Sequence, residues 1–234
     1  MRSACSIVMA RGGSKRIPRK NARSFCGLPM VAWPVTHAVK SGLFSEVVIS
    51  TDDEEIASVA CEHGASFYGL RPAALSNDFA ITPAVLQYEL KEIEKRTGTM
   101  PKVCCCLYGT SIFASPERLH LACEALKKQD CDFVMAVLEY SHPIERALQF
   151  DKAGHLVYRQ PEFMSRRTQD IVPSYYDTGM LYVFNVETFF EQKCTFLQMR
   201  RRAIIVCSNE AVDIDNESDW VLAEQLAIMQ NLLK

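Results

Sequence analysis

Two clusters of charged residues, one near each end of the chain, have the composition of a site for a phosphate-bearing ligand. The segment Arg11–Asn21 reads RGGSKRIPRKN, and six basic residues but no acidic one lie between Arg11 and Arg23. Glycine lets the backbone approach an anion, consecutive amide N–H groups can form a nest for phosphate, and Lys and Arg supply the charge that a triphosphate requires. Asp213 and Asp215 are separated by one residue. At a strand end both carboxylates would share one face, which suits a divalent cation with oxygen ligands such as Mg²⁺.

Each cluster also has a simpler interpretation. The basic segment could be a solvated turn, and it has neither the GxxxxGK[ST] nor the GxGxxG form of a phosphate loop. Asp215 or Asn216 could cap a helix expected at Glu217–Leu233, because acidic and amide side chains favour helix N-termini. One residue could serve both roles, so metal binding and capping both remain open.

The elements that must position these clusters follow from the apolar pattern. Strand-like and helix-like segments alternate along most of the chain, which predicts an α/β fold with a mostly parallel sheet and helices on both faces. Ligands of such sheets bind at the carboxyl ends of the strands, and the basic segment directly follows the first strand. The expected strands are Ser6–Ala10, Glu46–Thr51, Ala65–Tyr68, Lys102–Tyr108, Phe133–Leu138, Thr178–Phe184 and Ala203–Val206. The expected helices are Pro29–Val39 (broken or late-starting because of Pro34), Asp53–His63, Thr82–Arg96, Pro116–Lys128, Glu187–Glu191 and Glu217–Leu233.

Between Tyr140 and Tyr176 the alternation stops. Two strand-like segments, Ala147–Phe150 and His155–Tyr158, flank a turn-like sequence, and Arg159–Pro173 is polar and irregular. We therefore predict a single domain over residues 1–234, with residues 140–176 inserted as an excursion from the core.

Composition narrows the class of protein. The chain has 234 residues, of which 48% are hydrophobic and 23% charged, with a formal net charge of −2, which excludes disorder, collagen and coiled coil. No apolar run reaches the roughly 18 residues of a membrane span, and the apolar run before Arg11 is too short for a signal-peptide core. We therefore expect a cytoplasmic protein with no membrane partner, whose ten cysteines stay thiols.

The distribution of charge indicates the kind of ligand. Without the six cations of the basic segment, 20 basic and 28 acidic residues remain, a formal charge of −8. Such a chain concentrates its positive field in one place. We expect a compact anion as its partner and no nucleic acid, because nucleic acid requires a wider basic face.

The segment Ala10–Asn21 resembles the nucleotide-binding signature of CMP-sugar synthetases, the cytidylyltransferases that activate eight- and nine-carbon acidic keto sugars. Three more blocks agree in order, namely Ser50–Ala57, Leu70–Asp78 and Val212–Trp220. The resemblance implies a Rossmann-like nucleotidyltransferase fold and a homodimer. It also implies a Mg²⁺-dependent reaction in which CTP and a nine-carbon keto-sugar acid give a CMP-sugar and pyrophosphate, with residues 140–176 as a dimerisation and sugar-binding arm.

Within this family the chain looks like the branch that activates pseudaminic acid. The segments Pro143–Leu148, Arg167–Asp170 and Tyr176–Gly179 carry that likeness. The chain departs from the family pattern at Tyr108–Ser111 and Thr178–Met180, both expected near the sugar. Alternative substrates of the same reaction are N-acetylneuraminic, legionaminic and Kdo-type acids. A catalytically silent nucleotide-binding regulator is a remote alternative, disfavoured because Lys20 and the paired aspartates are present.

The resemblance also implies roles for individual residues. Arg11, Lys20 and Asp213 are the expected catalytic residues, and Asp213 and Asp215 the expected metal ligands. The nucleotide would be bound by Arg11, Gly12, Gly13, Ser14, Lys15, Arg16, Lys20, Asn21, Arg71 and Asp78. The sugar acid would be bound by Arg166, Arg167, Gln169, Asp170 and Asp177. Arg71 could also be an ordinary loop arginine, and Arg166 and Arg167 a solvated pair.

Overall fold

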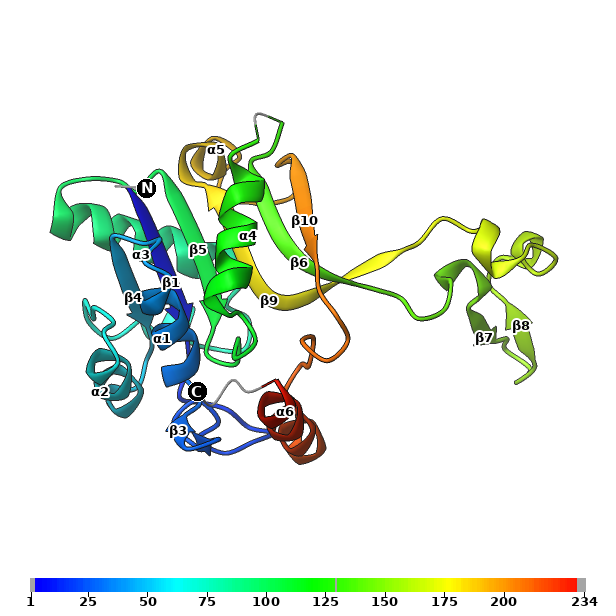
Figure 1. The fold of residues 1–234 in the computed structure, drawn as a ribbon, viewed down its shortest axis with the longest axis horizontal. Coiled ribbons are helices and arrows are strands. Elements are labelled where there is room, and N and C mark those ends of the chain that lie inside the picture. Colours follow the sequence, from blue (N-terminus) through cyan, green and yellow to red (C-terminus); the bar gives the residue numbers. More distant parts are fainter. Residues whose placement is uncertain (1–2, 129, 231–234) are drawn as a thin grey trace.

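A six-stranded sheet runs through the body of the protein (Figure 1). The computed structural model describes residues 3–128 and 130–230. The strand order is β10-β6-β9-β5-β1-β4. β1 pairs in parallel with β4 and β5, and β10 with β6, whereas β9 runs antiparallel between β5 and β6. The predicted mostly parallel sheet is therefore confirmed. Its strands are β1 (Ala4–Met9), β4 (Glu46–Ser50), β5 (Val103–Tyr108), β6 (Phe133–Glu139), β9 (Tyr175–Asn185) and β10 (Arg201–Ile205).

Helices cover both faces of the sheet, as predicted. The apolar faces of α1 (Ala32–Lys40), α2 (Glu54–Glu62), α4 (Pro116–Leu126) and α6 (Glu217–Met229) pack into one buried cluster. Those of α3 (Thr82–Thr97) and α5 (Val186–Glu191) pack into a second cluster on the other face. Side chains of a strand point alternately to the two faces, so Cys105 lies in the first cluster while Cys104 and Cys106 lie in the second.

Local sequence sets several helix boundaries. The side chain of Asp53 caps α2 by accepting from the backbone N–H of Ile56, and Ser115 caps α4 in the same way. α1 begins late, at Ala32, which leaves Pro34 in the first turn, where its missing N–H costs no hydrogen bond. α3 ends at Thr97, and the next residue, Gly98, adopts the left-handed conformation.

Some predicted boundaries differ from the structure. The expected strand Ala65–Tyr68 is wrong, because only a single bridge joins Ser66 to Val48, and glycines with positive φ bend the chain on either side of it. β9 begins earlier than expected, at Tyr175. α6 ends at Met229 in the described residues, and residues 231–233 of the predicted helix lie outside them. Small elements complete the body: β2 (Ser24–Phe25), β3 (Leu28–Pro29) and the 3-10 helix η1 (Ala73–Leu75). None of the helices in the described ranges has the length and apolarity that crossing a bilayer requires.

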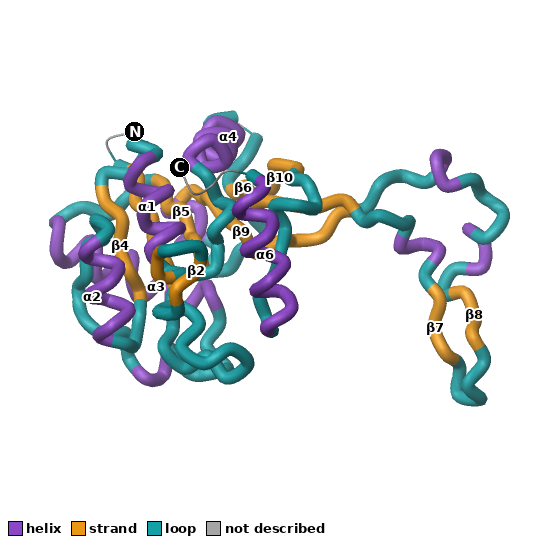
Figure 2. The backbone as a smooth tube through the Cα atoms, turned by 60° about the horizontal axis from the view of Figure 1, so that its bottom comes forward, coloured by secondary structure: helices purple, strands orange, loops and turns teal. Residues whose placement is uncertain are grey.

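Between β6 and β9 the chain leaves the body as a long arm of residues 140–174 (Figures 1 and 2). The predicted hairpin is present: β7 and β8 pair antiparallel across a turn in which the Asp151 carboxylate accepts from the backbone N–H groups of Ala153 and His155. All residues of both hairpin strands are exposed, including Phe150 at 75% and Leu156 at 56%. The arm contains η2 (Ile144–Arg146), β7 (Leu148–Phe150), β8 (Leu156–Tyr158), η3 (Pro161–Phe163) and η4 (Thr168–Asp170).

Candidate active site

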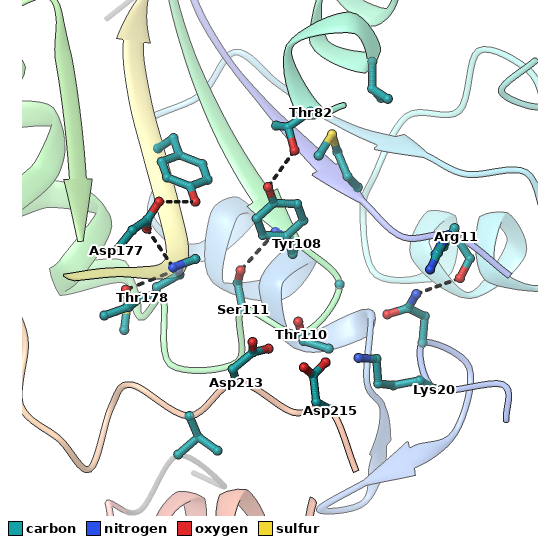
Figure 3. Close-up of a pocket in the computed structure, with 18 of the residues that line it drawn as sticks. Arg11, Lys20, Thr82, Tyr108, Thr110, Ser111, Asp177, Thr178, Asp213 and Asp215 are labelled. Carbon is teal, nitrogen blue, oxygen red and sulfur yellow. Dashed lines mark hydrogen bonds between the residues drawn. The ribbon is translucent and has the colours of Figure 1, made fainter. Parts of the chain in front are cut away.

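A cavity of about 810 Å³ lies where the basic loop, the carboxyl end of β5, the start of β9 and the segment before α6 meet (Figure 3). Its size is typical of ligand pockets, and the carboxyl ends of parallel strands are where α/β sheets bind ligands. The two charged clusters, almost 200 residues apart in sequence, line the same cavity. They contribute Arg11, Arg16, Lys20 and Asn21 from one side and Asp213 and Asp215 from the other.

Close packing fixes the backbone of the basic loop. A Cβ atom on Gly12 would lie 2.6 Å from an Asp53 carboxylate oxygen, so no larger residue fits there, and the Gly12 N–H donates to Asp52 at 2.9 Å. Asn21 donates from Nδ2 to the Arg11 carbonyl at 2.8 Å, which closes the loop. A side chain at Gly109 would overlap that of Asn21, which explains the glycine in the segment where the chain departs from the family pattern.

Acidic residues from other parts of the chain pair with the cations of the loop. Asp78 accepts from Arg11 Nη1 at 2.7 Å and from Lys15 Nζ at 2.6 Å, and these two cations lower the pKa of its carboxyl group. Both cations therefore already hold a carboxylate, and a phosphate bound by the same N–H groups would take the place of Asp78. Gly12, Gly13, Ser14 and Lys15 themselves lie beside the cavity and are not part of its lining.

Two cations anchor the loop and do not line the cavity. Arg19 pairs with Asp53 and Glu55 at the start of α2. Arg23 pairs with Glu217 at 2.5 Å at the start of α6, and its guanidinium lies 4.3 Å from the centre of the Trp220 ring. The sequence analysis assigned all six cations to the positive field that binds the anion. In the structure these two hold the loop in place instead.

Asp213 and Asp215 point into the cavity beside Lys20 (Figure 3). Lys20 donates to the carbonyl oxygen of Ile214 at 2.6 Å, and burial lowers the pKa of its ammonium while both aspartates oppose that shift. Arg16 pairs with Asp215 at 2.6 Å. Partial burial and the neighbouring charge of Asp215 raise the pKa of Asp213, which is the effect expected of carboxylates held close together.

The structure assigns the capping of α6 to Asn216. Asn216 accepts from the N–H of Asp219, and Asp219 accepts in return from the N–H of Asn216 and from that of Asp215. The Asp215 carboxylate therefore caps nothing. Two carboxylates that point into one cavity fit a hard divalent cation with oxygen ligands. The described residues hold no group of three or more His, Cys, Asp or Glu suited to a metal.

Arg71 is no ordinary loop arginine. Its side chain lines the cavity yet is only 6% exposed, and burial lowers the pKa of its guanidinium. Nε donates to the Ser76 hydroxyl at 3.2 Å and Nη1 to the Ser50 hydroxyl at 3.3 Å. A buried guanidinium held by two hydroxyl groups can donate to a ligand from its remaining N–H groups.

The far half of the cavity is aromatic and polar. Asp177 accepts from the Tyr182 hydroxyl at 2.8 Å and from the Gly179 N–H at 2.9 Å. The register of β6 and β9 shifts here, and Thr178 donates to the Ala136 carbonyl at 3.0 Å, which turns Asp177 into the cavity. The Tyr108 hydroxyl lies 2.7 Å from that of Thr82. Tyr108 belongs to the segment that the sequence analysis expects near the sugar, and it lines the cavity. The predicted site residues did not include Thr82 and Tyr182, which line it as well.

Four predicted sugar-binding residues lie elsewhere. Arg166, Arg167, Gln169 and Asp170 are exposed on the arm and take no part in the cavity of their own chain. Arg167 pairs with Asp170 at 3.0 Å, and the guanidinium of Arg166 lies 4.9 Å from the centre of the Phe163 ring. Of the five, only Asp177 reaches the site within one chain.

Comparison with known proteins agrees with this geometry. The sequence profile of a family described as cytidylyltransferase matches residues 5–232. The chain belongs to the cytidylyltransferase family. It is 33% identical over 226 residues to a pseudaminic acid cytidylyltransferase of Campylobacter jejuni, covering 97% of this chain and 96% of the relative. It is 30% identical to a CMP-N,N'-diacetyllegionaminic acid synthase of Legionella pneumophila, over 94% of each chain.

Two solved structures have the same fold. A CMP:2-keto-3-deoxy-manno-octonic acid synthetase complexed with CTP superposes with a TM-score of 0.66 at 17% identity, covering 98% of this chain and 99% of that one. A 4-diphosphocytidyl-2C-methyl-D-erythritol synthase of Anaerococcus prevotii superposes with a TM-score of 0.65 at 11% identity, covering 97% and 99%. The predicted nucleotidyltransferase fold is therefore confirmed, and this family membership establishes the chain as a nucleotidyltransferase.

Proposed function

We propose that this cytidylyltransferase joins CTP and a nine-carbon keto-sugar acid (a nonulosonic acid) to give the CMP-sugar and pyrophosphate, and that pseudaminic acid is its preferred sugar. The observation that carries the proposal is the convergence of the basic loop and the Asp213–Asp215 pair on one cavity, whose far half offers Asp177 and Tyr108. The similarity to a pseudaminic acid cytidylyltransferase along almost the whole chain supports this choice of sugar.

The reaction asks the protein mainly to position groups and neutralise charge. The anomeric hydroxyl of the sugar attacks the α-phosphorus of CTP, a new P–O bond forms, and the bond to pyrophosphate breaks. Arg11 and Lys20 would hold phosphate oxygens and offset their charge, after Asp78 gives up Arg11 and Lys15. Asn21 and the glycines would bring the loop backbone close to the nucleotide, and Arg16 would contact the leaving pyrophosphate.

We propose Mg²⁺ as the cation held by Asp213 and Asp215. When bound, it would orient and polarise a phosphate of CTP. Without a cation, Arg16 and Lys20 offset the negative charge of the two aspartates, and Lys20 is hydrogen-bonded to the backbone at Ile214. Arg16 would then be free to move from Asp215 to the ligand.

The arm would act in a homodimer. Its hairpin exposes apolar side chains, and four of the residues proposed for sugar binding lie on it, outside the cavity of their own chain. Arg166 and Arg167 would then hold the sugar carboxylate in the partner's cavity, since guanidinium groups pair with carboxylates through two parallel bonds.

All ten cysteines are free thiols, which agrees with the cytoplasmic location we propose.

A substrate panel tests the proposal. The purified protein is incubated with CTP, Mg²⁺ and in turn pseudaminic, N-acetylneuraminic, legionaminic and Kdo acids, and the CMP-sugar is detected by mass. We expect the highest kcat/KM with pseudaminic acid. A higher value with another acid would assign that substrate instead, and CTP binding without any CMP-sugar would support the silent regulator.

A further inference from the structure

A carboxyl group is buried one helical turn from Val85, a residue that lines the cavity. Glu89 lies in the middle of α3 on the same face as Val85, Leu86 and Leu90, and only 4% of its surface is exposed. Burying a carboxyl group on an apolar helix face is costly unless it is hydrogen-bonded. Val85 lines the cavity but Glu89 does not, so Glu89 can act on a ligand only through another residue.

Ser50 connects Glu89 to Arg71. Ser50 is the last residue of β4 and is 1% exposed, and its hydroxyl donates to Oε1 of Glu89 at 2.6 Å. Since a hydroxyl has one proton, the same oxygen accepts the N–H of Arg71 Nη1 at 3.3 Å. The order of donation is thus guanidinium to hydroxyl to carboxylate. This order favours an ionised Glu89, because hydrogen bonds to a charged acceptor are the stronger ones.

Burial and the neighbouring groups let Glu89 change its protonation near neutral pH. Burial raises the pKa of Glu89 to about 7, opposed by the Ser50 hydrogen bond and by Arg71. Glu92, also on α3, adds a small increase. Asp52 and Glu89 favour the charged form of Arg71, whereas Arg11 disfavours it.

We propose that Glu89 is a positioning residue for nucleotide recognition: through Ser50 its carboxylate holds Arg71 in place, so CTP binds more weakly when Glu89 is neutral. The inference rests on the proposed function, because it takes CTP as the ligand. Glu89 touches no substrate, and its effect falls on binding and not on the chemical step.

The test compares Glu89→Gln with Glu94→Gln between pH 5.5 and 8.5. Glu94 is an exposed residue of the same helix, so its variant loses the same charge without touching the network. CTP affinity is measured by calorimetry without sugar, and KM and kcat in the full reaction. At pH 8 we expect Glu89→Gln to raise Kd and KM for CTP about five- to tenfold, the size of one charge-assisted hydrogen bond, with kcat within about twofold.

The pH profile separates positioning from a structural role. The titration of CTP itself is common to both variants, so the ratio of their CTP affinities isolates Glu89. That ratio should shrink as pH falls through about 7, because the native carboxyl group then becomes neutral as well. Ser50→Ala should raise KM for CTP similarly, and combining it with Glu89→Gln should add little.

Two results would overturn the inference. One is a CTP affinity of Glu89→Gln equal to that of Glu94→Gln at every pH. The other is full additivity of Ser50→Ala and Glu89→Gln. If the unchanged protein failed to bind CTP, the proposed function would fail, and this inference with it; if it binds CTP, a negative result removes only the role of Glu89.

Discussion

Lys20 donates a 2.6 Å hydrogen bond to the carbonyl oxygen of Ile214, the residue between the two aspartates of the cavity. This bond joins the basic loop that follows β1 to the segment that precedes α6. It attaches the ammonium group to the backbone, in the same cavity as both carboxylates. Arg11 and Arg16, the other loop cations that line the cavity, bond to carboxylate side chains, whereas Lys20 bonds to the main chain.

We predict that Lys20→Met lowers kcat about 100-fold, the scale of losing one fixed donor to developing negative charge. Arg23→Met is the matched control, because Arg23 belongs to the same loop but pairs with Glu217 outside the cavity. Its kcat should fall less than about tenfold, because Arg19 still anchors the loop to the start of α2. Steady-state kinetics on both variants make the measurement, and equal losses of kcat would mean that only the overall charge of the loop matters.

The six strands of the central sheet and the loop that follows β1 could be predicted from the sequence because each depends on local information. A short apolar run of β-branched residues indicates a strand, and glycines among cations directly after it indicate an anion site at the strand end. The direction of β9 depends on the long excursion before it, which local patterns do not encode. The bulge that turns Asp177 into the cavity follows from that direction and was equally hidden.

The candidate site shows the same division. Asp215 and Asn216 are both good helix caps by type, and only the structure shows that Asn216 takes the role and leaves Asp215 in the cavity. The helical period of α3 places Glu89 on its buried face, but the partners Ser50 and Arg71 come from elsewhere in the chain. The sequence could indicate an unusual buried acid without indicating what it does.

Glu89 should also make stability depend on pH. Its pKa rises from 4.5 in the unfolded chain to about 7 in the folded protein, because burial disfavours the charged carboxylate. The contribution of Glu89 to the stability of the folded protein is therefore highest below about pH 4.5, where Glu89 is neutral, and this contribution is lost as pH rises through about 7. We predict that at pH 8 the free energy of unfolding of Glu89→Gln exceeds that of the unchanged protein by about 2–3 kcal/mol, so that the variant unfolds at a higher urea concentration. The difference should be smaller at pH 5. A variant that is more stable but binds CTP less tightly would have exchanged function for stability.

The control for this measurement is Glu94→Gln, which should follow the unchanged protein at both pH values because Glu94 is exposed. Equal unfolding midpoints for Glu89→Gln and the unchanged protein at pH 8 would contradict the prediction.

We predict that Phe150→Asp combined with Leu156→Asp converts a dimer into a monomer. Both side chains are exposed on the β7–β8 hairpin of the arm. A carboxylate at either position would oppose burial of the hairpin against a partner chain, because charged residues are disfavoured in the core of an interface. Sedimentation measures the oligomeric state. A chain that sediments as a monomer before the substitutions would contradict the dimer.

Mixed dimers test whether the arm completes the partner's cavity. Arg166→Ala with Arg167→Ala removes the arm guanidiniums, and Asp213→Asn disables the cavity of the other chain. Each homodimer should be inactive. An equal mixture should regain about a quarter of the normal activity at most, since about half of its dimers are mixed and only one of the two sites in a mixed dimer is intact. If the arm residues acted within their own chain, that same mixed dimer would have no intact site.

The last prediction concerns the aspartates and the helix that follows them. Asp213→Asn and Asp215→Asn remove one carboxylate each and leave the capping box of Asn216 and Asp219 in place. Both variants should lose at least about 100-fold in kcat and require more Mg²⁺, because a cation with two protein ligands loses one of them. Asn216→Ala is the reverse case. It removes the cap, at a cost of about 1 kcal/mol in stability, and should leave the Mg²⁺ requirement unchanged. Magnesium titrations of activity, read beside melting temperatures, separate the two roles. If Asp213→Asn and Asp215→Asn melted earlier while their Mg²⁺ requirement stayed normal, the carboxylates would support the fold of the segment and would not be metal ligands.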